Sequence, residues 1–432
     1  MNTINDAFLG GAGHGVLRLI TAGSVDDGKS TLIGRLLYDS KGVFADQLDA
    51  ISRAKYKRVA GDGIDFALLT DGLEAEREQG ITIDVAYRYF STPLRKFIIA
   101  DAPGHEQYTR NMVTGASTAD AAIVLIDATR AADGQLLPQT RRHSMIARLL
   151  GIRHIVVAVN KMDLVQWDRA VFERIREAYA DLARRLAIDG FHILPLSALN
   201  GDNVVTASPH TPWHEGPPLL ALLENLAVAD DGRGQPLRLP VQWVLRDGGD
   251  RADDFRGYAG RLASGALRVG DAVAVQPSGQ RACVARLLRG ADDVDEAVAG
   301  DSITVVLDRD VDVSRGDTLA HPDALAQTGR EFEAELCWLD AQPLNPARRY
   351  LLKHGTRLTS AKIREVRARR DVRELQEVAQ ADGSLSMNDI GRVVLVTREM
   401  LAVDRYDALP ANGAFILIDE ATHQTAAAGM LR

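Results

Sequence analysis

The feature that most constrains this chain is the segment 23–31, Gly-Ser-Val-Asp-Asp-Gly-Lys-Ser-Thr, which fits the phosphate-loop pattern G-x-x-x-x-G-K-[ST]. An apolar run beginning at Val16 precedes it, and Leu32-Ile-Gly-Arg-Leu-Leu follows it. This is the strand–loop–helix context that the motif requires. The glycines let the backbone fold around a phosphate, so that successive N–H groups and the following helix N-terminus point at the anion.

The whole loop is therefore a predicted nucleotide contact. Lys29 is expected to reach the β- and γ-phosphates as a catalytic residue, and the Ser30 hydroxyl to bind Mg²⁺. The predicted loop residues are Gly23, Ser24, Val25, Asp26, Asp27, Gly28, Lys29, Ser30 and Thr31.

A second phosphate motif ends the apolar run Phe97-Ile-Ile-Ala, which continues as Asp-Ala-Pro-Gly-His. Asp101 at this strand end is expected to hold Mg²⁺, and the Gly104 N–H to face the γ-phosphate. His105 is the predicted catalytic residue that orients the attacking water. The nucleotide contacts predicted here are Asp101, Ala102, Pro103 and Gly104.

Two further strand ends indicate which base is bound. The run Ile155-Val-Val-Ala-Val closes on Asn160, Lys161, Met162 and Asp163, and a later one closes on Ser197, Ala198 and Leu199. A carboxylate at Asp163 can accept both N1–H and the exocyclic N2–H₂ of guanine, a donor pair that adenine lacks. Four such motifs in this order predict a domain that binds GTP or GDP.

The segment between the two phosphate motifs supplies a candidate switch residue. In Asp71-Gly-Leu-Glu-Ala-Glu-Arg-Glu-Gln-Gly-Ile-Thr-Ile-Asp, residues 74–79 suit a short helix that Gly80 can end. Thr82 follows in an extended stretch, and we expect it to close over Mg²⁺ and the γ-phosphate when GTP is bound.

The 432 residues suit about three domains. Apolar strands alternate with helical stretches over 1–228, which predicts an α/β GTPase domain with a doubly wound, mostly parallel sheet. Short strands broken by Gly and Asp follow and predict two antiparallel β-barrels, at 235–325 and at 328–432.

Net charge and hydrophobic patterning indicate which partners and which cellular compartment to expect. The net charge is −8 and no apolar run approaches the ~18 residues of a membrane span, so we expect a cytoplasmic protein without membrane or nucleic-acid partners. One arginine-rich run, from Arg364 to Arg373, offers a nucleic-acid face. Interleaved apolar residues and acids favour a solvated strand and turn instead.

The motifs carry a family resemblance that covers essentially the whole chain after Leu17. The phosphate loop, Glu-Arg-Glu-Gln-Gly-Ile-Thr-Ile-Asp and Asp-Ala-Pro-Gly-His-Glu-Gln-Tyr-Thr-Arg-Asn-Met resemble the translational GTPases of the elongation factor Tu and 1-alpha type. Asp-Val-Ala-Tyr-Arg-Tyr-Phe-Ser-Thr, Asp-Phe-Arg-Gly-Tyr-Ala-Gly and Ser-Arg-Gly-Asp resemble one branch, the GTPase (large) subunit of bacterial sulfate adenylyltransferase. The connection at 127–143 is longer than is usual in that family.

The resemblance implies a regulatory GTPase that works with a separate small subunit in a heterodimer or a higher assembly. That partner would transfer the adenylyl group of ATP to sulfate, giving adenosine 5′-phosphosulfate and pyrophosphate. A translation factor that carries aminoacyl-tRNA is the alternative, because it shares the GTPase domain and both barrels. The residues at 24–31 and 84–108 favour the sulfate-activating branch.

Overall fold

The computed structural model describes residues 15–40, 66, 85–105, 109–227, 232–247, 255–371, 376–379 and 383–432. The chain divides into two compact units, of which the first contains strands β1–β6 and the second strands β7–β23. Each unit is described by itself below. The predicted boundaries at 228, 235, 325 and 328 stay predictions.

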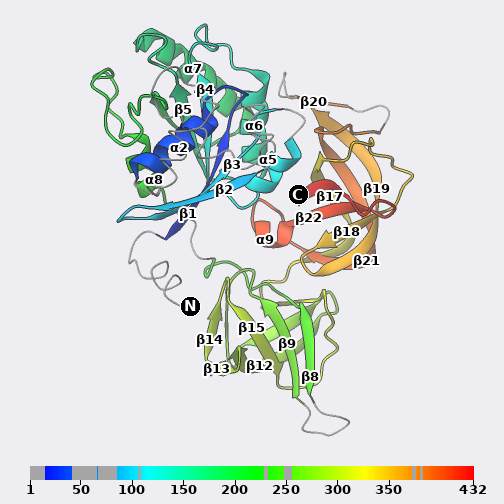
Figure 1. The fold of residues 1–432 in the computed structure, drawn as a ribbon. Coiled ribbons are helices and arrows are strands. Elements are labelled where there is room, and N and C mark those ends of the chain that lie inside the picture. The colour runs from blue at the N-terminus through cyan, green and yellow to red at the C-terminus, as the bar shows by residue number, and fades with distance from the viewer. Residues whose placement is uncertain are drawn as a thin grey trace. The chain divides into compact units, whose positions relative to one another are not determined.

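The first unit is an α/β domain (Figure 1). Its six-stranded sheet has the order β2-β3-β1-β4-β5-β6, in which β2 alone pairs antiparallel, at the edge. The elements are β1 (Val16–Ala22), α2 (Lys29–Asp39), β2 (Ala86–Ser91), β3 (Lys96–Asp101), α5 (Thr109–Ala116), β4 (Ala121–Asp127), α6 (Pro138–Leu149), β5 (His154–Asn160), α7 (Arg169–Leu186), β6 (His192–Pro195) and α8 (Leu219–Asn225).

The register of this sheet brings the motif residues to one edge. Parallel strands end at the same side of a sheet, and ligands of doubly wound domains bind outside those carboxyl ends. Thr21 is the register partner of Asp101, and Asp127 is the partner of Asn160. Four strand ends that are far apart in sequence therefore meet at a single site.

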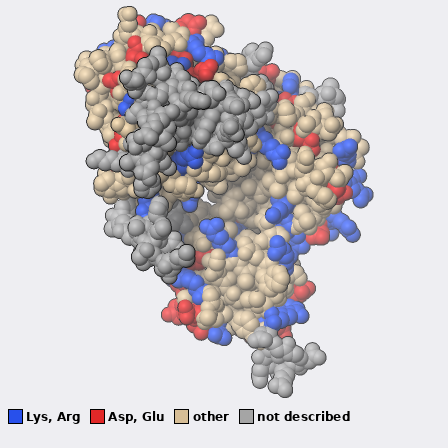
Figure 2. Space-filling model, in the orientation of Figure 1, with Lys and Arg blue, Asp and Glu red and all other residues tan. Residues whose placement is uncertain are grey.

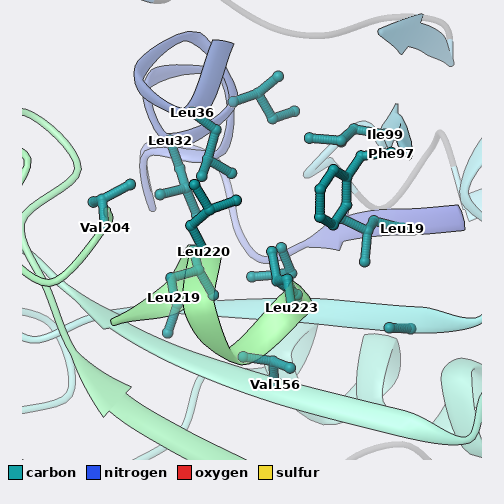
Figure 3. Close-up of a cluster of buried hydrophobic side chains, with 14 of the residues drawn as sticks. Leu19, Leu32, Leu36, Phe97, Ile99, Val156, Val204, Leu219, Leu220 and Leu223 are labelled. Carbon is teal, nitrogen blue, oxygen red and sulfur yellow. The ribbon is translucent and has the colours of Figure 1, made fainter. Parts of the chain in front are cut away.

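The sheet is fixed in place by apolar side chains on its faces. Every residue of β4 is buried, as expected for a strand covered on both sides. On one face, Leu32 and Leu36 of α2 lie with Leu219, Leu220 and Leu223 of α8 over strand residues such as Phe97 (Figure 3). Helix α2, which begins at the phosphate loop, is thus anchored by its apolar stripe.

The second unit begins with an antiparallel barrel whose strands run in the order β7-β16-β11-β12-β15-β9-β8. Strands β7 and β8, at the two ends of this order, are consecutive in the chain, so the short segment between them joins both edges of the sheet. In that segment, the Val241 amide donates to the Asp317 carbonyl and the Gln242 amide donates to the Ala259 carbonyl. The elements are β7 (Leu239–Pro240), β8 (Trp243–Asp247), β9 (Phe255–Arg261), β10 (Ala266–Arg268), β11 (Ala272–Gln276), β12 (Gln280–Arg289), β13 (Asp292–Val294), β14 (Glu296–Val298), β15 (Ser302–Leu307) and β16 (Thr318–Ala320).

The last barrel closes through the pairing of β18 with β19, which completes the row β18-β22-β23-β17-β21-β19. Its interior holds a separate apolar cluster that includes Trp338, Tyr350 and Leu395. The elements are β17 (Gln327–Trp338), β18 (Tyr350–His354), β19 (Arg357–Arg370), β20 (Glu377–Val378), β21 (Ile390–Val403), α9 (Pro410–Gly413), β22 (Ala414–Asp419) and β23 (Thr425–Leu431).

The arginine-rich run lies mainly on β19, and its described members are paired with carboxylates. Arg364 lies 2.6 Å from Glu331, Arg367 lies 3.2 Å from Glu333, and Arg370 lies 2.8 Å from Glu335. In the space-filling view of Figure 2, Asp and Glu side chains are scattered among the Lys and Arg side chains of the barrels. The pairing agrees with the solvated-strand interpretation of this run. Among the helices of the described ranges, none is long and apolar enough to cross a bilayer.

Candidate nucleotide-binding site

The phosphate loop forms the turn between β1 and α2. Gly28 is the N-cap of α2 and has a left-handed φ of 93°. A Cβ on Gly28 would collide with Nδ2 of Asn160, so glycine is required here for both conformation and space. Helix α2 begins at Lys29, and the amides of its first turn lie at the positive end of the helix dipole, where a phosphate binds.

Lys29 is buried under this loop. Its Nζ donates to the carbonyl oxygens of Gly23 at 3.1 Å and Ser24 at 2.7 Å. An ammonium group has three N–H donors, so this geometry leaves the third for a phosphate oxygen. Burial lowers the pKa of Lys29, and attraction by Asp101 and Asp27 opposes that shift.

The predicted metal ligands Ser30 and Asp101 are in contact. The Ser30 hydroxyl donates to Oδ2 of Asp101 at 3.1 Å, and the Thr21 hydroxyl donates to Oδ1 at 3.0 Å. The carboxylate is thus oriented on one side by β1 and faces the phosphate loop on the other. A hydroxyl and a carboxylate oxygen at this spacing fit Mg²⁺, which prefers hard oxygen ligands and keeps several waters.

The Asp101–His105 turn packs directly on the phosphate loop. A Cβ on Gly104 would lie 2.8 Å from the Val25 amide nitrogen and 2.5 Å from Nζ of Lys29, so only glycine allows this approach. Within this turn, Ala102 and Pro103 are buried, whereas His105 at its end is exposed. The side chain that follows Gly104 therefore faces solvent beside the phosphate loop.

Asn160 joins the phosphate loop to the base-binding loops. Its Nδ2 donates to the carbonyl oxygen of Asp27 at 2.8 Å, and its Oδ1 accepts the Ala198 N–H at 2.9 Å. All of these groups are buried, so each would be left unpaired without the asparagine amide. The residue thus sets the distance between the phosphate site and the base site.

The rest of the Asn-Lys-Met-Asp motif lies at the same edge. Lys161, with a left-handed φ of 61°, donates from Nζ to Oδ2 of Asp127 at 2.7 Å. Burial acts to raise the pKa of Asp127, but hydrogen bonds from Lys161 and Thr129 prevail and hold it below its usual range. Met162 is buried and supports the loop, whereas Asp163 is half-exposed and available to a base.

The Ser-Ala-Leu loop is held from two sides. The Ser197 carbonyl accepts the Gly201 N–H at 2.8 Å, which closes the turn. Arg35, on α2, donates to the carbonyl oxygen of Ala198 at 3.3 Å and also to that of Leu199. The backbone amides of this loop are thereby fixed next to the Asn160 side chain.

The remaining predicted residues are placed as follows. Val25, Asp26 and Thr31 lie in or directly after the phosphate loop, with Asp26 exposed at a left-handed φ of 67°. The predicted switch residue Thr82 lies outside the described residues, so its expected role as metal ligand and catalytic residue stays a prediction.

Sequence reasoning missed two residues that contact the phosphate loop. His143 on α6 accepts the Gly23 N–H through Nδ1 at 3.0 Å. Arg130, in the connection from β4 to α6, donates from Nη1 to the Val25 carbonyl at 2.8 Å. Neither belongs to a nucleotide motif: Arg130 lies between β4 and α6, and His143 lies within α6, so no motif spacing indicates them.

Two protein-family models match this chain, one in its N-terminal half and one at its C-terminal end. Residues 14–229 match the model of the elongation factor Tu GTP binding domain, and residues 331–432 match that of the GTP-eEF1A C-terminal domain-like family. With the sheet and the barrels described above, these matches confirm the predicted fold class and show that the first unit is a GTP-binding domain.

Relatives match over almost the entire length. Sulfate adenylyltransferase subunit 1 of Aeromonas hydrophila is 49% identical over 99% of this chain and 88% of its own length. The protein of the same name from Tolumonas auensis is 49% identical over 96% of this chain and 86% of its own length. The bifunctional enzyme NodQ of Rhizobium sp. (strain N33) is 51% identical over 96% of this chain, which spans 63% of that relative. The chain belongs to the sulfate adenylyltransferase subunit 1 family of the elongation factor Tu-type GTPases.

Proposed function

We propose that this chain is the GTP-hydrolysing regulatory subunit of a sulfate adenylyltransferase. The observation that carries the proposal is the match to sulfate adenylyltransferase subunit 1 over 99% of the chain, without an unmatched domain in between. The geometry around the phosphate loop supports the GTPase part, because Lys29, Ser30, Asp101 and Gly104 lie in contact there.

Positioning and charge stabilisation account for most of phosphoryl-transfer catalysis. Lys29 binds the β- and γ-phosphate oxygens through its remaining N–H donor, and the first amides of α2 bind the β-phosphate. Ser30 and Asp101 would hold Mg²⁺, which neutralises phosphate charge when it is bound. His105 orients the water that attacks the γ-phosphorus.

Base selection is assigned to the Asn160–Asp163 loop. The Asp163 carboxylate accepts two N–H groups of guanine, and adenine would leave that carboxylate unpaired. Asn160 and Lys161 act indirectly, because their side chains bind Asp27, Ala198 and Asp127. The specificity of the site thus depends on a single carboxylate held by a braced loop.

The partner in this proposal is a small catalytic subunit that transfers the adenylyl group of ATP to sulfate. Forming a sulfate–phosphate anhydride from ATP is uphill, so GTP hydrolysis can add driving force only if the two reactions are linked. The proposed link is ordering of the Thr82 segment and the Asp101–His105 turn by the γ-phosphate. Because GTP and ATP are both drawn from the cytoplasm, we place the complex there.

An elongation factor that carries aminoacyl-tRNA is the rival function. Two observations disfavour it: the full-length relatives carry the sulfate adenylyltransferase name, and the described arginines of β19 are paired with carboxylates. A purified complex with the small subunit separates the two functions. We expect GTP to raise the rate of adenosine 5′-phosphosulfate formation, and the small subunit to raise GTP turnover. The proposal would be refuted if GTP left the rate of adenylation unchanged and the small subunit left the rate of GTP turnover unchanged.

A further inference from the structure

The γ-phosphate end of the predicted site lies where the Gly104 turn meets the phosphate loop. Gly104, whose N–H is predicted to face the γ-phosphate, packs against the Ser24–Val25 peptide and the Lys29 ammonium group. A Cβ on Gly104 would lie 2.8 Å from the Ser24 carbonyl carbon and from the Val25 nitrogen, and 2.5 Å from Nζ of Lys29. The Ser24–Val25 peptide is therefore the part of the phosphate loop that lies beside this turn. A cation beside Val25 would be placed where negative charge develops.

Arg130 supplies such a cation. Its Nη1 donates to the Val25 carbonyl at 2.8 Å and lies 3.6 Å from Oδ1 of Asp27. Asp27 is fully buried, and within the described part of the chain its Oδ1 has no hydrogen-bond donor. The guanidinium thus lies beside a buried carboxylate while it remains 44% exposed at the loop surface. Burial raises the pKa of Asp27, and attraction by Lys29 and by Arg130 opposes that shift.

The backbone that carries Arg130 is fixed on both sides. Its N–H donates to the carbonyl of Asp127 at 3.2 Å, and the Asp127 side chain is tied to Lys161. Further along, Arg174 of α7 donates to the Ala132 carbonyl at 2.8 Å. In the first turn of α6, Nε2 of Gln139 donates to the Gly104 carbonyl at 3.2 Å. Arg130 therefore projects from a braced segment onto the phosphate loop.

The guanidinium has donors to spare. It carries five N–H groups in a planar fork. Within the described residues, the bond to Val25 is its one hydrogen bond. The Val25 carbonyl points away from the amide face of the loop, where a phosphate binds, so the long side chain of Arg130 has to swing around the loop edge to bring these donors onto phosphate oxygens.

We propose that Arg130 is a catalytic arginine for GTP hydrolysis, supplied by the chain itself, whose guanidinium binds the γ-phosphate and the β–γ bridging oxygen. This inference rests on the proposed GTPase function. In the reaction, the water oxygen bonds to the γ-phosphorus and the bond from that phosphorus to the bridging oxygen breaks. The electron pair stays on GDP, and the water proton passes to the released phosphate. Arg130 stabilises the charge that collects on the bridging oxygen, as arginines do in other GTPases.

A purely bracing role for Arg130 makes a different prediction. If the residue only holds the phosphate loop, Arg130→Ala would weaken GDP and GTP equally and leave kcat unchanged. A contact made mainly in the transition state lowers kcat and leaves GDP affinity nearly intact. Aluminium fluoride bound with GDP mimics the transferring phosphoryl group, so its extra affinity reports the same contact without turnover.

The experiment compares full-length wild type, Arg130→Ala, Arg130→Lys and the control Arg148→Ala. Arg148 also donates from its guanidinium to a carbonyl, that of Ala187 at 2.8 Å, but lies at the far end of α6. For each protein, kcat for GTP is measured with and without the small subunit, as are the affinities for fluorescent GDP with and without aluminium fluoride.

We expect Arg130→Ala to lower kcat by about 100-fold or more, within the range for catalytic arginines, and to abolish the gain from aluminium fluoride while GDP affinity changes little. Arg130→Lys should recover only part of the loss, because lysine lacks the planar fork, and Arg148→Ala should match wild type. Equal loss of affinity for GDP with and without aluminium fluoride, or an unchanged kcat, overturns the inference. A wild-type chain that neither binds GDP nor hydrolyses GTP would instead refute the proposed function.

Discussion

At the scale of single residues, the site separates contacts with the nucleotide from contacts that hold the loops. Asp163 is half-exposed and His105 is exposed, and in the proposed mechanism they contact the base and the water. Asn160, Asp27 and His143 are buried, and their bonds hold the phosphate loop to the neighbouring elements. Substitutions in the two groups should therefore give different results: changed chemistry in the first, changed loop geometry in the second.

The preference for guanine tests the role of Asp163, one of the exposed residues. We expect Asp163→Asn to weaken GTP binding by roughly 10- to 100-fold, since a hydrogen bond to a charged group contributes about 1.5–3 kcal/mol. Xanthosine triphosphate should bind better than it does to wild type, because the asparagine N–H₂ can donate to the 2-oxo group. Competition titrations with both nucleotides measure the change, and equal GTP affinity in variant and wild type would remove Asp163 from the base site.

His143 gives a pH dependence of folding. Burial, with repulsion by Lys29 and Arg142, lowers its pKa from 6.5 to about 3. Between these values the unfolded chain binds a proton that the native chain does not, so the free energy of unfolding falls as the pH drops from 6.5. The slope approaches one proton, or about 1.4 kcal/mol per pH unit.

His143→Asn keeps an acceptor for the Gly23 N–H and removes the titrating group. Chemical denaturation of this variant between pH 4 and 7 should show a shallower slope than wild type. His423→Asn, at an exposed position, is the control and should leave the slope as it is. Parallel slopes for wild type and His143→Asn would contradict the assignment.

At the scale of elements, the sequence predicted those strands whose apolar runs end on a motif. The strands over 97–101 and 155–160 are of this kind, and both occur as expected. Strand β23, Thr-Ala-Ala-Ala-Gly-Met-Leu, has few β-branched residues, so its sequence alone does not indicate a strand. It forms because β17 and β22 pair with it from both sides, which is tertiary information.

The same reasoning explains which site residues were predicted. Residues of the four motifs were found because their function fixes their spacing. Arg130 and His143 were missed because they act through contacts with Val25 and Gly23 that arise only when β1 and β4 are paired. No local pattern of the sequence contains those contacts.

Asn160 tests whether the loop elements depend on one another. Asn160→Ala would leave the Ala198 N–H and the Asp27 carbonyl unpaired in a buried setting, at a cost of about 1–3 kcal/mol each. We expect lower stability and, in addition, at least tenfold weaker GDP binding. Asn412→Ala is the matched control, since its buried amide bonds to Ala402 and Asp404 in the barrels. Asn412→Ala should lower stability and leave the affinity for GDP unchanged. Equal GDP affinity in the two variants would contradict the coupling of the loops.

At the scale of the whole molecule, the two barrels form one unit joined by ionic contacts. Arg238 of the first barrel is fully buried and binds Asp404 of the second through two bonds, at 2.7 Å and 2.9 Å. Arg357 makes a second link, to Asp317 and to the Gly316 carbonyl. The barrels should therefore unfold together.

Arg238→Met tests this link. Breaking a buried pair by removing one partner typically costs about 3–5 kcal/mol, because the other charge stays behind. We expect a lower midpoint in denaturant and separate transitions for the two barrels. Arg405→Ala removes an arginine of the exposed pair with Asp407 and should leave the midpoint unchanged. A single unshifted transition in Arg238→Met would show that this contact does not join the barrels.

The complete complex tests whether turnover in one subunit drives chemistry in the other. His105→Ala should bind GTP with nearly wild-type affinity and lower its turnover by on the order of 100-fold, because the residue acts mainly on the transition state. Lys29→Ala should instead lose nucleotide binding. If adenylation is driven by hydrolysis, the His105→Ala complex should keep its basal rate of adenosine 5′-phosphosulfate formation and lose the increase that GTP gives to wild type. A non-hydrolysable GTP analogue on the wild-type complex separates binding from hydrolysis: full stimulation by the analogue would mean that the γ-phosphate alone switches the partner. In that case His105→Ala would retain stimulation as well, and the two subunits would be coupled by conformation without the energy of hydrolysis.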